Sequence, residues 1–235
     1  MIDIYGGKDP RNIPSYSAGD AARYLNIPVS TIRSWTIGRK YSSTQGQKKF
    51  HPLIETQKQK PLTLTFTNLI ELHILRAIRH HHKIDLDKVR TALEFINEQI
   101  KIPHPLAHQD FHTDGADLFI EKYGSLINAS QKGQLALKDV LKIHLERIEP
   151  DDQGIATKLY PFTRSSLENN PKIVVIDPRI SFGKLIIAGT GIPTRILAER
   201  YHAGDSIEEL AYDYDCESIK IEEAIRCEMN WKTAA

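Results

Sequence analysis

Cysteine is scarce in this 235-residue chain, which contains only Cys216 and Cys227, both among the last twenty residues. Two thiols so placed argue against a disulfide framework, and free thiols are typical of a reducing compartment. Long apolar runs are also missing, since no stretch of about eighteen apolar residues is present to span a membrane. The first ten residues lack the apolar core of a signal peptide. The sequence therefore predicts a soluble, cytoplasmic protein.

Complete catalytic and nucleotide-binding motifs are missing as well. Gly189-Thr-Gly-Ile-Pro193 has the glycines of a phosphate-binding loop, but neither Gly-Lys-Ser/Thr nor Gly-x-Gly-x-x-Gly occurs in the chain. These glycines therefore indicate a turn into a helix that begins at Pro193 or Thr194. Asp110, Asp114 and Asp117 lie around a glycine, where aspartates are common turn residues. We expect no enzymatic activity and no cofactor.

The histidines are the remaining candidates for metal ligands, because helical histidines four residues apart can hold zinc. There are two groups: His73 with His80–His82, and His104, His108 and His112. Pro103 and Pro105 disfavour a helix through His104 in the second group. Neither group has a cysteine or a clustered carboxylate to complete a ligand set. We expect solvated or hydrogen-bonded histidines and no metal site.

Charge is distributed unevenly, although the net charge of the chain is only +1. Residues 1–60 contain ten Lys and Arg against four Asp and Glu, whereas residues 102–171 and 172–235 each carry a net charge of −3. A basic N-terminal third on an almost neutral protein is typical of a module that contacts DNA. The acidic remainder indicates a partner other than phosphate.

Residues 16–36 predict two short helices joined by a tight turn. Ser17 is placed to cap the first helix, with Asp20 at its third position, as in a capping box. Pro28 ends this helix, because proline disfavours the helical conformation of the residue before it. The spacing of Ile32 and Trp35 turns both side chains inward on the second helix. The outward side chains are then Ser30, Thr31, Arg33 and Ser34, a set that suits a DNA groove.

A basic segment follows this helix pair. Leucines and a phenylalanine alternate with threonines over Pro61–Phe66, which predicts a strand that pairs with Pro52–Thr56 across a polar turn. The cations before these strands are Arg39, Lys40, Lys48 and Lys49. A two-stranded ribbon with such cations resembles a wing whose lysines contact phosphates. The alternative is a solvated basic loop.

The next segments are read as an alternation of helices and strands. The predicted helices are Asn68–His82, capped by Thr67, then Leu86–Ile100, capped by Asp85, and Gln134–Ile148. Between them, a turn at Asp114-Gly115 predicts a short strand that pairs with Ser125–Asn128. Another strand is expected over Ala156–Phe162, followed by a linker over Thr163–Lys172.

The last segment opens with a strand at Ile173–Pro178 and continues with three helices. These are Thr194–His202, Ser206–Tyr212, which Ser206 caps, and Ile219–Asn230. The last helix region carries Glu217, Glu222, Glu223 and Glu228 against Lys220 and Arg226. Carboxylates facing phosphates would be repelled, so this three-helix unit is assigned to dimerisation or partner binding.

Two parts of the chain resemble known families. Tyr16-x-x-x-Asp-Ala-Ala-Arg-Tyr-Leu25, with Ser30-Thr-Ile-Arg-Ser-Trp35, resembles the helix-turn-helix of MerR-type and excisionase-like proteins. Val175-Ile-Asp-Pro-x-Ile-x-Phe-Gly-Lys184, with Ala203-Gly-Asp-Ser-Ile-Glu-Glu-Leu210, resembles the domain-of-unknown-function family numbered 433. The combination is similar to the larger VapB-type antitoxins. This resemblance implies a PIN-like ribonuclease toxin as the partner.

The predicted fold class is mainly α with small β elements (α+β). We expect a flexible leader at 1–15, a MerR-like winged helix-turn-helix at 16–102, a middle α+β region with a linker at 103–171, and a C-terminal trihelical unit at 172–235. The predicted function is that of a type II antitoxin that forms a homodimer, binds operator DNA to repress its own operon, and neutralises the toxin. The alternative is a MerR-like regulator that senses a small ligand and has no toxin partner. Candidate toxin-binding cations are Arg179, Lys184, Arg195 and Arg200.

Overall fold

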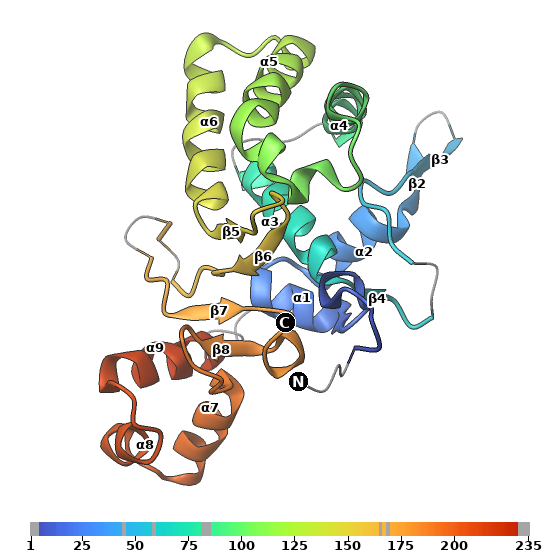
Figure 1. The fold of residues 1–235 in the computed structure, drawn as a ribbon. Coiled ribbons are helices and arrows are strands. Elements are labelled where there is room, and N and C mark those ends of the chain that lie inside the picture. The colour runs from blue at the N-terminus through green and yellow to red at the C-terminus, as the bar shows by residue number, and fades with distance from the viewer. Residues whose placement is uncertain are drawn as a thin grey trace.

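Helices dominate the computed structural model, which describes residues 5–43, 46–57, 60–80, 86–164, 166–167 and 170–229 (Figure 1). The helices are α1 (Ala18–Leu25), α2 (Val29–Ile37), α3 (Phe66–His80), α4 (Leu86–Ile100), α5 (Ala116–Ile127), α6 (Gln131–Leu145), α7 (Thr194–Ala203), α8 (Ile207–Asp213) and α9 (Ser218–Met229). The small sheets among them confirm the predicted α+β class. In the part of the chain that the structure describes, no helix is both long and apolar enough to cross a membrane.

The strands form two short pairs and one larger sheet. The strands are β1 (Tyr16–Ser17), β2 (Arg39–Ser43), β3 (Gly46–Phe50), β4 (Thr63–Leu64), β5 (Ile148–Pro150), β6 (Ala156–Leu159), β7 (Val174–Ile176) and β8 (Leu185–Ile187). Antiparallel pairs join β1 to β4 and β2 to β3. The other four strands form an antiparallel sheet in the order β5-β6-β7-β8, which lies between the middle helices and α7–α9 (Figure 1).

The first helix pair forms as its local sequence predicts. The Ser17 hydroxyl accepts the Asp20 N–H at 3.0 Å, while the Asp20 carboxylate accepts the Ser17 N–H at 3.0 Å, so the capping box is confirmed. Asn26 ends α1 in the left-handed conformation, with φ of 49°. Pro28 then precedes α2. The turn between the two helices is therefore set by residues inside it.

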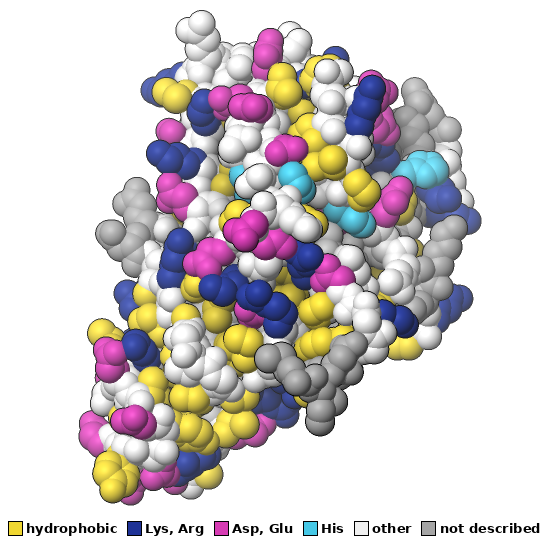
Figure 2. Space-filling model, in the orientation of Figure 1, with side chains coloured by type: hydrophobic (Ala, Val, Ile, Leu, Met, Phe, Trp, Pro, Cys, Tyr) yellow, Lys and Arg dark blue, Asp and Glu magenta, His cyan; other side chains and the backbone are white. Residues whose placement is uncertain are grey.

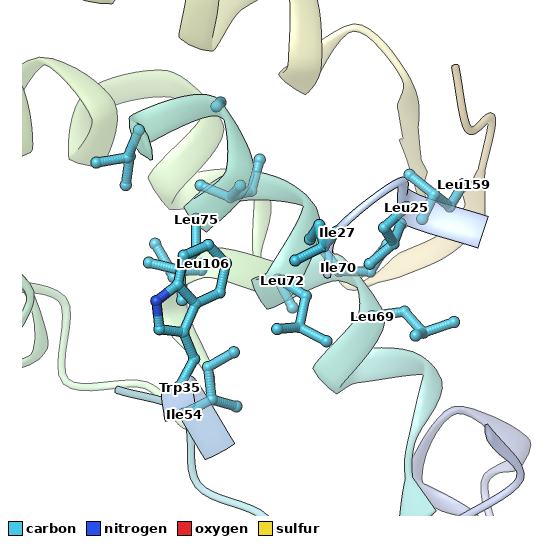
Figure 3. Packing of buried hydrophobic residues seen from close by; sticks show 14 of the residues in the cluster. Leu25, Ile27, Trp35, Ile54, Leu69, Ile70, Leu72, Leu75, Leu106 and Leu159 are labelled. Carbon is cyan, nitrogen blue, oxygen red and sulfur yellow. The ribbon is translucent and has the colours of Figure 1, made fainter. Parts of the chain in front are cut away.

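Helix α3 lies at the centre of the main hydrophobic core. Leu69, Leu72 and Leu75 are at most 2% exposed and pack in one cluster with Trp35 from α2 (Figure 3). Leu159 of β6 belongs to the same cluster. Burial of each such side chain contributes about 1.5–3 kcal/mol. The helix pair and the middle region thus share one core, while α7–α9 have a smaller core of their own around Leu197, Leu210 and Ile221.

The start of α3 differs from the prediction. Thr65, rather than Thr67, caps the helix, because the Asn68 N–H bonds to the Thr65 hydroxyl at 3.1 Å and the Thr65 N–H bonds to the Asn68 side chain at 3.2 Å. Thr67 instead bonds to Asn12 of the N-terminal segment at 3.2 Å. Helix α3 therefore begins at Phe66, two residues earlier than expected. Asp85, the predicted cap of α4, lies outside the described residues.

The prediction of strands within residues 111–128 was wrong. Residues Phe111–Gly115 form a π-helical turn that continues directly into α5. Ala116, Phe119, Ile120 and Tyr123 are buried, and their spacing is that of one face of a helix. Burial of this face outweighs the local turn preference of Asp114-Gly115.

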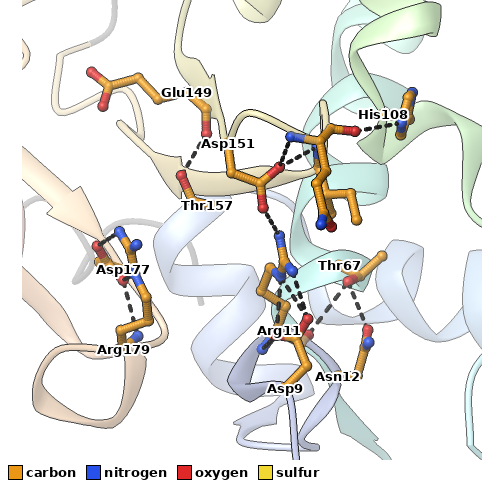
Figure 4. Close-up of polar contacts among 12 residues, drawn as sticks. Asp9, Arg11, Asn12, Thr67, His108, Glu149, Asp151, Thr157, Asp177 and Arg179 are labelled. Atoms are coloured by element: carbon orange, nitrogen blue, oxygen red, sulfur yellow. Dashed lines mark hydrogen bonds and ion pairs between the residues drawn. The ribbon is translucent and has the colours of Figure 1, made fainter.

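The segment before the helix pair has specific tertiary contacts, although a flexible leader was expected. Pro10–Asn12 form a 3₁₀ turn, and the Asp9 carboxylate accepts the Arg11 N–H at 2.9 Å. Arg11 bonds to Asp9 and also reaches the Asp151 carboxylate at 2.5 Å (Figure 4). Asp151 lies just after β5, so this ion pair connects the N-terminal segment to the middle region.

His73 of α3 is buried against α6 and against the segment that follows β6. Its ring is 0% exposed, lies 4.9 Å from the His144 ring centroid, and stacks on Phe162 at 5.7 Å. The His73 Nε2 atom lies 3.1 Å from the His144 carbonyl oxygen. Such a ring is hydrogen-bonded, but it is not solvated. Among the described residues, no three His, Cys, Asp or Glu side chains come together as a metal site.

Acid is expected to destabilise the protein through its buried histidines. Burial lowers the pKa of His73 well below its ordinary value and the pKa of His112 to about 4. The unfolded chain therefore binds more protons than the folded protein between about pH 6.5 and pH 4, and the free energy of unfolding falls as the pH drops through this range. His104, whose pKa the carboxylate of Glu71 raises, acts in the opposite direction.

Urea unfolding at pH 7.5 and pH 5 measures this effect. The loss of stability on going to pH 5 should be smaller by roughly 1–2 kcal/mol in His112→Gln than in the wild type. His202 is exposed, so His202→Gln serves as the control and should lose as much stability at pH 5 as the wild type does. Identical losses in the His112→Gln variant and the wild type would refute the burial of a neutral His112.

Candidate nucleic-acid interface

Helix α2 presents one polar face to solvent. Ile32 and Trp35 are 0% and 2% exposed, which confirms their predicted inward orientation. Ser30 and Arg33 are exposed, whereas Thr31 and Ser34 are half-buried. The Trp35 carbonyl accepts the N–H groups of Leu53 at 2.7 Å and Ile54 at 3.1 Å, so the chain that leaves the hairpin is fastened to the end of α2.

The hairpin beside α2 consists of the basic residues themselves. Its strands are β2 and β3, not the predicted Pro52–Thr56 and Pro61–Phe66. Of the latter segment only β4 is a strand, and it pairs with β1. Leu64 and Phe66 alternate with threonines because both are fully buried, one in β4 and the other at the start of α3. The predicted position of the two-stranded ribbon was therefore wrong, because β2 and β3 form the hairpin earlier in the chain.

Two lysines lie opposite each other on this hairpin. The register places Lys40 across from Lys49, and directly opposed residues of an antiparallel pair point to the same face. Both side chains are exposed, and in the described part of the chain neither has an ion-pair partner. Like charges placed this way repel each other, and a bound polyanion relieves that repulsion. Arg39 is also exposed, and the side chain of Lys48 lies outside the described part of the structure.

The base of the hairpin is anchored in the protein. Phe50 is 6% exposed, and the Arg90 guanidinium from α4 lies 4.9 Å from its ring centroid and donates to the His51 carbonyl. Gly38 connects α2 to β2 with φ of 81°. The hairpin therefore projects from a fixed base next to α2 (Figure 1).

Arg79 is a further cation at α2 that the sequence analysis missed. It lies on the last turn of α3, is exposed, and donates from Nη1 to the Thr31 hydroxyl at 2.7 Å. Its guanidinium lies 5.8 Å from the Trp35 ring centroid. Thr31 and Arg79 are 48 residues apart in the chain, so no local pattern reports this contact.

The predicted partner-binding cations lie on the C-terminal part of the chain, and most are engaged internally. Arg179 bonds to Asp177 at 2.6 Å, Arg195 to Glu199 at 2.7 Å, and Arg200 to both Asp205 and Asp213 (Figure 4 for Arg179). Lys184 is exposed and has no ion-pair partner among the described residues. Lys184 is therefore the cation of this set that is most available to a partner.

Two of the four carboxylates assigned to the surface of α9 point inward instead. Glu223 is 2% exposed and bonds to Thr163 and to Arg164, the latter at 2.7 Å. Glu228 accepts a hydrogen bond from Thr194 at 2.6 Å and pairs with Arg23 of α1 at 3.1 Å. These two acidic side chains connect α9 to other parts of the fold, whereas Glu217 and Glu222 are exposed.

Family comparisons agree with two separate parts of this architecture. Residues 14–93, which contain α1, α2 and the hairpin, match a family described as a "Putative DNA-binding HTH domain". Residues 174–226, which contain β7, β8 and most of α7–α9, match a "Protein of unknown function (DUF433)". The N-terminal match is to a helix-turn-helix domain in general, so the MerR-type resemblance stays a prediction.

Relatives from Mycobacterium tuberculosis extend the likeness to almost the whole chain. "Putative antitoxin VapB45" is 26% identical over 236 residues, which cover 91% of this chain and 93% of that protein. "Uncharacterized protein Rv2308" is 21% identical over 89% of this chain and 88% of its own. The crystal structure of Rv2018 shares the fold, with a TM-score of 0.69, 22% identity, and coverage of 91% of this chain and 98% of the other.

Proposed function

We propose that this protein is an antitoxin that binds operator DNA, represses its own operon and neutralises a PIN-like ribonuclease toxin. The proposal rests mainly on one observation: the exposed face of α2, Lys40 and Lys49 of the β2–β3 hairpin, and Arg79 lie next to one another. Their cations match the charge of a DNA backbone. The likeness to a protein described as a putative antitoxin supports the second half of the proposal.

In the proposed complex, α2 enters the major groove and the hairpin follows the neighbouring backbone. Ser30, Thr31, Arg33 and Ser34 then face base edges and phosphates, as short hydroxyls and an arginine do in such grooves. Arg39, Lys40, Lys48 and Lys49 contact phosphates, which fix position without reading sequence. Residues 16–102 serve as the DNA-binding unit, and a homodimer matches a two-fold operator.

The C-terminal unit, residues 172–235, serves for dimerisation and toxin binding in this proposal. Figure 2 shows hydrophobic side chains gathered over the C-terminal helices and next to charged ones. Phe182, Tyr212 and Ile219 are 67%, 87% and 61% exposed, and apolar side chains that gather into a patch mark sites of protein contact. Lys184 is the cation best placed to reach an acidic ribonuclease site, and Arg179, Arg195 and Arg200 first have to leave their own carboxylates.

DNA binding is tested with a labelled duplex from the region upstream of the protein's own gene. Arg33→Ala should weaken affinity at 0.15 M salt about tenfold or more, because an arginine contact in a groove contributes about 1–3 kcal/mol. Arg195→Ala, which removes an exposed cation of α7, should leave affinity unchanged. Equal affinities of Arg33→Ala and wild type would refute the assigned role of α2.

Toxin binding is tested by co-expression of the tagged protein with a ribonuclease encoded by a neighbouring gene. The proposal predicts that the two proteins co-purify and that the complex has lost ribonuclease activity. If the protein binds its own operator but retains no nuclease and protects no RNA, the antitoxin assignment fails and a plain DNA-binding regulator remains.

A further inference from the structure

A cavity of about 150 Å³ lies among α3, α5 and α6 in the middle of the chain. Ile78 of α3, Ile120, Tyr123 and Ile127 of α5, and Leu137 of α6 form most of its wall. Four of these five side chains are at least 94% buried, whereas Ser130, which also lines the cavity, is exposed, so the cavity opens to solvent at the α5–α6 turn. Well-packed cores contain few voids larger than a water molecule. An apolar pocket of this volume that reaches into the core therefore requires an explanation.

The lining of the cavity is chemically neutral. No charged side chain contributes to it. Its polar groups at the α5–α6 turn already have partners: the Ser130 hydroxyl accepts the Gly133 N–H at 3.2 Å, and the Gln134 amide donates to the Ala129 carbonyl at 3.3 Å. Water in such a space lacks the two to four polar partners that hold an internal water. Apolar cavities of about this size bind molecules such as benzene or xenon.

The solvent side of the cavity is formed by the α5–α6 turn, where Ser130 is exposed and Gln134 is half-buried. Gln134 lies directly on the backbone of α5 at Gly124, where an added Cβ would come within 2.7 Å of the Gln134 Cδ. The absence of a side chain at position 124 thus lets Gln134 cover the cavity.

We propose that this cavity binds a small, uncharged, apolar molecule and that its occupancy is transmitted to the α2 surface. Ile78, which lines the cavity, directly precedes Arg79, whose guanidinium bonds to Thr31 of α2. A molecule that displaces Ile78 shifts the same helical turn that holds Arg79. The binding site stands on the cavity alone, whereas its effect on DNA rests on the proposed function.

Benzene is the probe for the site, and benzoate is the mismatched probe. Benzene should raise the melting temperature of the wild-type protein and shift the methyl NMR signals of Ile120, Ile127 and Leu137. Benzoate should do neither, because no group in the cavity compensates a buried charge. If benzene causes no shifts, or if benzoate binds equally well, the site is refuted.

A cavity-filling variant makes the test specific. Ile127→Phe should abolish the benzene-induced shifts, whereas Leu135→Phe, at an α6 position that is 60% exposed and does not line the cavity, should keep them. If Ile127→Phe does not fold, the comparison of benzene with benzoate in the wild type still decides whether the cavity binds an apolar molecule. Benzene-induced shifts that persist in a folded Ile127→Phe variant would place the binding elsewhere and overturn the proposal.

The transmission to DNA is measured separately. Saturating benzene should change the affinity of the wild type for its operator at least twofold and leave that of Ile127→Phe unchanged. Benzene binding without a change in affinity refutes the transmission. A wild type that binds benzene but no DNA contradicts the proposed function and leaves the cavity result intact.

Discussion

Replacing Arg147 by Met should lower the free energy of unfolding by about 3–5 kcal/mol. Arg147 is 5% exposed and holds the chain between β6 and β7. Its guanidinium donates to the carbonyl oxygens of Tyr160 at 2.7 Å, Pro161 at 3.1 Å, Asn170 at 2.8 Å and Pro171 at 2.9 Å. Methionine fills similar space but leaves these acceptors without a donor, and an unsatisfied buried acceptor is destabilising.

The segment predicted as a linker is therefore tied to the rest of the protein by Arg147, in addition to the bonds of Thr163 and Arg164 to Glu223. Burial also lowers the pKa of Arg147 to about 10, so the cation remains charged at neutral pH. Urea unfolding at pH 7.5 measures the effect, with Arg195→Met as a control at a side chain that is 70% exposed. The control should change stability by less than about 0.5 kcal/mol. A loss below about 1 kcal/mol in Arg147→Met would contradict this account of the segment.

Replacing Gly38 by Ala should both destabilise the protein and weaken DNA binding. Gly38 has φ of 81°, and an added Cβ would lie 2.3 Å from the Phe50 carbonyl oxygen, a backbone atom that cannot move aside. The strain alone is worth about 1–3 kcal/mol. Relief of the clash requires the hairpin to separate from the end of α2, which moves Lys40 and Lys49 away from Arg33.

Gly46 provides a matched control on the same hairpin. Its φ is 102°, so alanine is strained there as well, but an added Cβ meets no atom within 4 Å. Gly38→Ala should therefore lose more stability and more DNA affinity than Gly46→Ala in thermal unfolding and operator titrations. Equal losses in the two variants would mean that the close approach to Phe50 does not set the position of the hairpin.

The parts of the fold that the sequence predicted correctly are those with local causes. The capping box of Ser17 and Asp20, the stop before Pro28 and the helix over Leu86–Ile100 each depend on residues within one element. Ser206 likewise caps α8, as predicted, and the structure adds Glu209 as the reciprocal partner of this cap. These features do not depend on the rest of the chain.

The errors arose where distant contacts outweigh a local pattern. The β2–β3 strands are rich in charged and polar residues, so their pairing has no apolar alternation to reveal it. Leu64 and Phe66 alternate with threonines because both side chains are buried in the core, and neither residue belongs to the hairpin. The hydrogen bond between Arg79 and Thr31 joins residues that are 48 positions apart, and the one between Arg23 and Glu228 joins residues that are 205 positions apart. Such pairs exist only once the fold brings their elements together.

The salt dependence of operator affinity tests most directly the central claim, that the α2–hairpin surface binds the DNA backbone. The logarithm of the association constant falls linearly with the logarithm of salt concentration, with a slope of about −0.9 for each phosphate that is neutralised. The double variant Lys40→Ala/Lys49→Ala should therefore bind more weakly and have a slope about 1.8 units less negative than the wild type. A wild-type slope near zero, or an unchanged slope in this variant, would contradict the claim.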